Sequence, residues 1–210
     1  TGDRVGIVMS NEMAAVEVIF GVMRAGMVAV PINLSVSDAA ITAMLNDADV
    51  VGLFATDEQL MRADDVRHAI PSVKSGRLFA VSSPSAPLPR GWNSYSAWLA
   101  QQSSADPAIV IEGNNIANII YSSGTTGVPK GIAHTHLGRL GWAYDLAVAL
   151  RYHDTARTLL TLGLYSNISW VMMLCTFLTG GTLLLQQKFD AAVAVRAIVE
   201  QGATHTAMVP

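Results

Sequence analysis

RVGIVMSNEMAAVEVIFGVMRAGMVAVPIN, residues 4–33, contains a complete strand–helix–strand pattern. Its two ends, RVGIVMS and VAVPIN, are short apolar runs rich in Val and Ile, which is typical of buried strands. Between them, apolar residues recur every three or four positions from Met13 to Met23, which predicts a helix with one apolar face. We expect Asn11 to cap the start of this helix and Gly26 to follow its end. The stretch therefore predicts a parallel βαβ unit.

The same alternation continues along the rest of the chain and predicts an α/β fold with mostly parallel sheets. Further strands are expected at 50–56, 77–82, 117–122, 130–135, 156–162, 181–186 and 204–209. Further helices are expected at 37–45, 58–69, 92–102, 137–150, from 168 to a cap at Gly180 and Gly181, and at 190–201. The loop SSPSAPLPRG, residues 82–91, is the best candidate boundary. We therefore expect one α/β subdomain over 1–91 and a second over 92–210.

Composition excludes several classes of protein. The net charge is −3, which offers no global attraction for nucleic acid. Hydrophobic residues make up 51% of the 210 residues and charged residues only 14%, so intrinsic disorder is excluded and part of the surface is expected to face other protein, as in a homo-oligomer. The apolar stretch 168–185 contains a Gly pair, which favours a buried helix and a strand over a membrane span.

The ends and the cysteine content point to a cytoplasmic piece of a longer protein. The chain begins with Thr1 and shows no signal peptide. Its single cysteine, Cys175, lies within an apolar run, has no charged neighbour in sequence and is expected to be a buried, inert thiol.

The stretch YSSGTTGVPKG, residues 121–131, carries the chemistry. It follows a predicted strand and combines hydroxyls, glycines and one lysine in a tight loop, which suits a polyphosphate. Backbone N–H groups can converge on phosphate oxygens there, and Lys130 adds a charge-assisted contact. The loop differs from a Walker A motif, in which the lysine directly follows the second glycine. Here Val128 and Pro129 separate Gly127 from Lys130.

On this stretch the sequence resembles the adenylate-forming superfamily of acyl-CoA and aryl-CoA synthetases, luciferases and nonribosomal adenylation domains. AGMVAVPIN, residues 25–33, and the segment from Leu178 to Pro210 extend the resemblance over nearly the whole chain. The resemblance implies the N-terminal part of an acyl-CoA synthetase with stacked sheets in an αβαβα arrangement. It also implies ATP, Mg²⁺ and coenzyme A as reaction partners of a carboxylic acid.

The resemblance also implies residue roles. Lys130 and Thr126 would act in adenylate formation, and Thr126 would lie near the Mg²⁺. The phosphate-binding set would be Ser122, Ser123, Gly124, Thr125, Thr126, Gly127 and Lys130. The family's adenine, ribose and hinge residues would lie beyond Pro210, so the chain alone is expected to be inactive.

A second stretch, LGLYSNISW at 162–170, departs from the family pattern of Pro, an aromatic residue and His. Gly163 stands at the Pro position and Ser166 at the His position, so a role that depends on imidazole is not transferred. The resemblance places the acyl pocket at Tyr165, Ser166, Asn167 and Ile168. The stretch contains no Asp for a substrate ammonium, which favours a simple acid over an amino acid.

Two alternatives remain open: a nonribosomal adenylation domain that loads an amino acid onto a carrier protein, and a non-catalytic module that binds phosphate or a nucleotide. His134 and His136, two apart on a predicted strand, allow a metal site but lack a third ligand at suitable spacing, and the resemblance places His136 at the start of a helix. The pairs Asp47 with Asp49 and Asp64 with Asp65 are interpreted as solvated helix faces.

Overall fold

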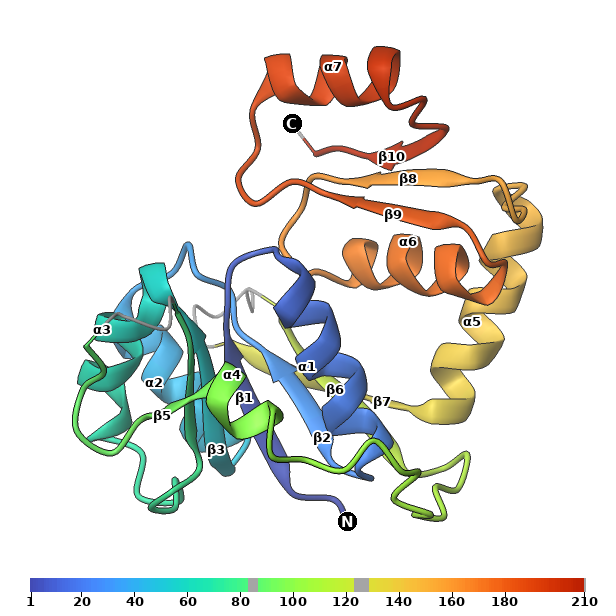
Figure 1. The fold of residues 1–210 in the computed structure, drawn as a ribbon. Coiled ribbons are helices and arrows are strands. Elements are labelled where there is room, and N and C mark those ends of the chain that lie inside the picture. The colour runs from blue at the N-terminus through green and yellow to red at the C-terminus, as the bar shows by residue number, and fades with distance from the viewer. Residues whose placement is uncertain (83–86, 123–128, 210) are drawn as a thin grey trace.

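The computed structural model describes residues 1–82, 87–122 and 129–209, which form two sheets with helices between and outside them (Figure 1). The first sheet has seven strands in the order β5-β4-β3-β1-β2-β6-β7, and the second has three in the order β10-β8-β9. Every pairing is parallel except that between β6 and β7. The predicted α/β class with mostly parallel sheets is confirmed.

The opening βαβ unit forms as the sequence predicts. Strand β1 (Arg4–Val8) pairs in parallel with β2 (Val28–Pro31), and helix α1 (Met13–Arg24) connects them. The apolar side of α1, including Val16 and Ile19, packs on one face of the sheet. The prediction that Asn11 caps α1 is wrong, because its side chain donates to the Leu162 carbonyl. Glu12 is the N-cap instead, and it makes no side-chain cap hydrogen bond.

The opposite face of the first sheet is covered by α2 (Asp38–Asp47) and α3 (Asp57–Arg67). Ser37 caps α2 by accepting a hydrogen bond from the Ala40 amide at 3.3 Å. Ile41 and Leu45 of α2 are buried in a second apolar core, which also includes residues of α3, β3 (Val50–Thr56) and β4 (Leu78–Val81). The expected helix at 92–102 is shorter in the structure, with β5 (Asn93–Ser94) preceding α4 (Tyr95–Leu99).

The first sheet continues across the boundary predicted at 82–91. Strand β6 (Ile116–Ser122) pairs with β2, and β7 (Lys130–Thr135) pairs with β6 as an antiparallel hairpin. The division between the two sheets therefore falls after β7 and does not coincide with the Pro-rich loop. Local composition located a loop, but the strand pairing depends on contacts between residues far apart in sequence.

Helix α5 (His136–Ala149) leads to the second sheet of β8 (Arg157–Leu160), β9 (Thr182–Leu185) and β10 (His205–Ala207). Helix α6 (Asn167–Leu178) ends before Gly180, whose φ of 80° favours glycine, so the apolar stretch 168–185 is divided into a helix and a strand. No helix of the described residues has the length and apolarity needed to cross a membrane. Cys175 is buried in α6, as expected.

Figure 1 shows the resulting layers: α2 and α3, the first sheet, α1 and α6, the second sheet, and finally α7 (Ala191–Glu200). One apolar core continues from the first sheet through α1 to α6, where Trp170 and Met173 are fully buried. This shared core holds the two sheets together.

Candidate functional site

The predicted phosphate loop begins and ends at the mouth of the β6–β7 hairpin. Ser122, the last residue of β6, lies opposite Lys130, the first residue of β7, and both side chains are exposed. Because β6 runs parallel to β2, this mouth lies at the carboxyl edge of the first sheet, where α/β folds commonly bind ligands. Ser123, Gly124, Thr125, Thr126 and Gly127 lie outside the described residues.

A hydrogen bond anchors this hairpin to α2. The Tyr121 hydroxyl donates to Oδ2 of Asp47 at 2.6 Å. Burial, together with the hydrogen bond and charge of Asp47, raises the pKa of Tyr121, so the phenol stays a neutral donor. Asp47 is exposed on α2, as the sequence predicts, and its bond to Tyr121 joins this helix to the strand that leads into the loop.

Two more of the carboxylates assigned to solvated faces also have partners. Asp49 lies 2.5 Å from the Arg4 guanidinium. Asp64 accepts from Arg67 at 2.5 Å and from the Trp92 indole at 2.8 Å. Most of these partners come from distant segments or from a loop, so a local charge pattern could not show them.

Asn11 brings the second predicted stretch to the same edge of the sheet. Its Nδ2 donates to the Leu162 carbonyl at 2.8 Å, and its Oδ1 accepts from the Leu164 amide at 3.0 Å. Asn11 follows β1, which is separated from β6 by β2 alone, a spacing of roughly 10 Å between the two strand axes. The connection from β8 to α6 therefore crosses the edge at which the phosphate loop begins.

The four residues assigned to the acyl pocket occupy this connection and the start of α6, and they differ in what they contact. Ser166 caps α6, because its Oγ accepts from the Ile168 amide at 3.2 Å. The Asn167 side chain accepts from Nη2 of Arg139 at 3.0 Å. Ile168 is 41% exposed. The Tyr165 ring packs so closely over Gly163 that a Cβ atom at position 163 would lie 2.1 Å from it. The glycine at this position therefore allows the turn that precedes α6.

Sequence reasoning missed Arg139. Its side chain is 4% exposed, and its guanidinium lies over the rings of Trp142 and Trp170 at 5.1 and 4.9 Å. Nε donates to Oδ1 of Asn118 at 2.9 Å. Burial lowers the pKa of Arg139 to about 10, so the group remains charged at neutral pH. No sequence signal marked it, because a helical arginine is usually exposed.

His134 and His136 do not share a strand. His134 lies on β7, whereas His136 is the first residue of α5, where the resemblance placed it. Burial lowers the pKa of both rings, and the charge of Arg139 lowers that of His134 further. Within 1–82, 87–122 and 129–209, no group of three His, Cys, Asp or Glu side chains could hold a metal ion.

The whole chain, residues 1–210, matches the family model described as AMP-binding enzyme. The chain belongs to the AMP-binding enzyme family. The resemblance to the adenylate-forming superfamily is thereby confirmed.

Several known members are similar to this AMP-binding chain. A long-chain-fatty-acid–CoA ligase, FadD13 of Mycobacterium tuberculosis, is 29% identical over 206 residues, which cover 95% of the chain and 38% of that ligase. A linear gramicidin synthase of Brevibacillus parabrevis is 25% identical over 184 residues, 88% of the chain and 2% of that synthase. The solved N-terminal domain of FACL13 from Mycobacterium tuberculosis matches this chain with a TM-score of 0.87 at 25% identity. The match covers 100% of this chain and 50% of the FACL13 chain.

The chain spans only part of the length of these relatives, 38% in the case of the mycobacterial ligase.

Proposed function

We propose that this chain forms part of an ATP-dependent acid–thiol ligase, an acyl-CoA synthetase that activates a carboxylic acid as its adenylate. The observation that carries the proposal is the meeting of two stretches at one sheet edge. The mouth of the hairpin presents Ser122 and Lys130, and Asn11 holds the β8–α6 connection at the same edge. A phosphate site and an acid site must adjoin for this reaction.

The proposed reaction has two steps. A carboxylate oxygen attacks the α-phosphorus of ATP, the bond from that phosphorus to the β-phosphate oxygen breaks, and pyrophosphate leaves. The thiol sulfur of coenzyme A then attacks the acyl carbon of the adenylate, AMP leaves, and the thiol proton is released. Positioning and neutralisation of charge on the leaving group dominate phosphoryl chemistry of this kind.

The residues of this chain act mainly in the first step. Lys130 would neutralise charge that develops on the leaving pyrophosphate, and Ser122 would donate a hydrogen bond to it. Mg²⁺ bound with the nucleotide would supply further neutralisation. Thr126, which the resemblance assigns to the metal, lies outside the described residues.

The acid would lie near Tyr165, Ser166, Asn167 and Ile168. Its class is a simple carboxylic acid, because the 162–170 stretch contains no acidic residue that could pair with an ammonium group. The adenine, ribose and hinge residues would come from the part of the relatives' length that this chain does not span. The buried, free Cys175 suits a reducing cytoplasm, where we expect the reaction to take place.

The similarity to a gramicidin synthase favours one second candidate, an adenylation domain that activates amino acids. ATP–pyrophosphate exchange in the whole protein, with panels of fatty, aryl and amino acids, distinguishes the candidates. Exchange with fatty or aryl acids, followed by formation of the acyl-CoA, is the expected result. Exchange with amino acids alone would favour the second candidate, and nucleotide binding without any exchange would indicate a non-catalytic module.

A further inference from the structure

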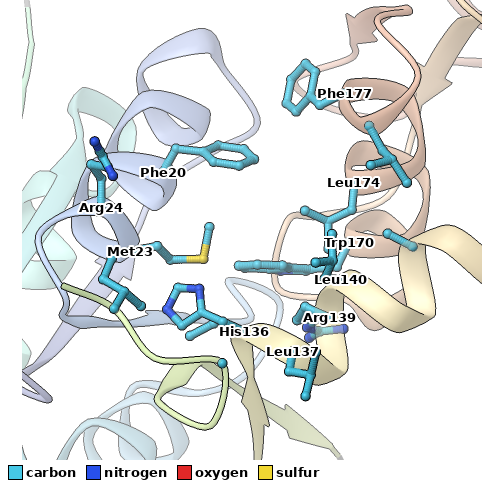
Figure 2. Close-up of a pocket in the computed structure, with 15 residues that line it drawn as sticks. Phe20, Met23, Arg24, His136, Leu137, Arg139, Leu140, Trp170, Leu174 and Phe177 are labelled. Atoms are coloured by element: carbon cyan, nitrogen blue, oxygen red, sulfur yellow. The ribbon is translucent and has the colours of Figure 1, made fainter.

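A cavity of about 500 Å³ lies between α1, α5 and α6. Figure 2 shows Phe20 and Met23 of α1 on one side, Trp170 and Phe177 of α6 on the other, and His136 at the base. The size is within the range of small-molecule pockets, which are usually apolar with a few polar groups. We call it the α1–α5–α6 cavity.

This cavity is separate from the predicted phosphate loop. Its lining includes Ala117 near the start of β6 and His136 just after the end of β7. Ser122 and Lys130, which flank the predicted phosphate loop, lie at the other end of the same hairpin. Six residues of β7 separate the two ends, or about 20 Å at roughly 3.3 Å per residue.

Two residues that line the cavity, His136 and Arg139, carry buried side-chain nitrogen atoms without hydrogen-bond partners. In the part of the chain that the structure describes, five buried side-chain nitrogen or oxygen atoms have no hydrogen-bond partner. Four of them lie on β6, β7 and the first turn of α5: Nδ2 of Asn118, Nε2 of His134, Nε2 of His136 and Nη1 of Arg139. Asn118 and His134 are paired across β6 and β7, and Arg139 donates to Asn118. Leaving such groups unsatisfied is costly, so a bound partner for them is expected.

The charge around the cavity is positive. Arg139 and Arg24 line it, and no described carboxylate does. Arg24 is exposed and paired with Asp106 at 2.5 Å, so its charge is already compensated. Arg139 is buried, and its hydrogen bonds go to the neutral amides of Asn118 and Asn167. A buried cation compensated only by neutral groups and aromatic rings favours an anion as its missing partner.

We propose that the α1–α5–α6 cavity binds an amphipathic monocarboxylate, with its carboxylate on Nη1 of Arg139 and its apolar tail between α1 and α6. The single buried guanidinium matches one carboxylate, and His136 adds a second polar contact beside it. Phe20, Met23, Leu174 and Phe177 provide an apolar surface for the tail. This site is additional to the proposed ligase site and does not depend on it.

The test uses octanoate, octanol and octylamine as probes, which share a tail and differ in charge. Calorimetry on the full chain without ATP measures affinity, and a change in tryptophan fluorescence, to which Trp142 and Trp170 beside the guanidinium contribute, accompanies binding. We expect octanoate to bind at least about tenfold more tightly than octanol, the worth of one charge-assisted hydrogen bond, and octylamine to bind most weakly.

Three variants complete the test. Arg139→Gln should reduce octanoate affinity about tenfold or more, whereas the matched control Arg24→Gln should change it less than about threefold. Leu174→Phe narrows the cavity without altering Arg139 and should also weaken octanoate, which keeps the test decisive if Arg139→Gln does not fold. Equal affinity for octanoate and octanol, or octanoate binding that Leu174→Phe leaves unchanged, would overturn the proposal.

Discussion

The side chain of Asn11 holds the backbone of Leu164, a residue 153 positions further along the chain. Oδ1 accepts from the Leu164 amide at 3.0 Å, while Nδ2 donates to the carbonyls of Leu162 at 2.8 Å and Gln186 at 3.3 Å. Asn11 is buried, and its position is set by the strand that it follows. One amide therefore fixes the connection of the second sheet onto the edge of the first.

Asn11→Ala should destabilise the protein by about 3 kcal/mol, because each buried donor or acceptor left unsatisfied costs roughly 1–3 kcal/mol. Urea unfolding measures the change. Asn46→Ala is the matched control, since the Asn46 amide donates to the Ala69 carbonyl at 3.0 Å but is exposed. The control should lose less than about 1 kcal/mol. Equal losses in the two variants would show that the Asn11 bridge contributes no more than a surface bond.

The sequence predicted most of the fold because apolar periodicity reports burial directly. The opening unit, the helix over 137–150 and the division of 168–185 all match observed elements within a few residues. Asn11 shows where this reasoning fails. A polar residue between a strand and a helix is equally compatible with a helix cap and with a long-range bridge. Only the tertiary partners, Leu162 and Leu164, decide between the two.

The candidate site could be proposed from the sequence where its chemistry is encoded locally. The residues that flank the phosphate loop, Ser122 and Lys130, are close in sequence to the glycines that suggested it. Arg139 and the Asp47–Tyr121 bond were missed, since each depends on packing between elements that local patterns do not relate. A buried arginine between two tryptophans has the same sequence pattern as an exposed one.

Under the proposed reaction, Lys130→Ala in the whole protein should slow adenylate formation about tenfold to a hundredfold, because a charge-assisted contact to the leaving phosphates contributes roughly 1.5–3 kcal/mol. Thr126→Ala should have a milder effect. Thiol capture of a supplied acyl-adenylate should remain nearly normal, since pyrophosphate has already left. Separate assays of the two half-reactions make this comparison.

Lys74→Ala is the matched control for Lys130. Lys74 is also exposed, but it precedes β4 and therefore lies at the amino edge of the same sheet. Both half-reactions should be unchanged in this variant. If Lys130→Ala slowed the two half-reactions equally, Lys130 would not act on the leaving phosphates.

Ser166→His should change acid selectivity and weaken α6. A larger ring at the start of the helix alters the space for the acid, so the kcat/KM ratio between short and longer or branched acids should shift by about 1–3 kcal/mol. Loss of the cap to the Ile168 amide should cost about 0.5–2 kcal/mol of stability. Steady-state kinetics over an acid panel, with urea unfolding, measures both effects.

Two further variants separate selectivity from stability. Ser166→Asn keeps an oxygen that can cap α6 and should retain most of the stability. Ser37→Ala removes the equivalent cap of α2 and should lower stability without changing the acid ratio. An acid ratio that stays constant in Ser166→His would remove this position from the acid pocket.

Stability should fall as the pH drops below about 6.5, and His134 and His136 should cause part of that fall. Burial lowers the pKa of both rings below the ordinary value of 6.5, and Arg139 lowers that of His134 further. A lowered histidine pKa means that the unfolded chain takes up protons first, so protonation favours unfolding between the ordinary pKa and the lowered one. Burial, with Glu58 and Asp57 nearby, raises the pKa of Glu12 above 4.5, which acts in the opposite direction as the pH falls.

Because these two effects oppose each other, the contribution of the histidines is measured by comparing variants, with Tm followed from pH 7.5 to 5.0. The double variant His134→Gln with His136→Gln should show a shallower decline than the parent, since glutamine takes up no proton in this range. The control His68→Gln, at the exposed end of α3, should follow the parent curve. Identical slopes in all three proteins would mean that the two half-buried rings are protonated as readily in the folded state as in the unfolded one.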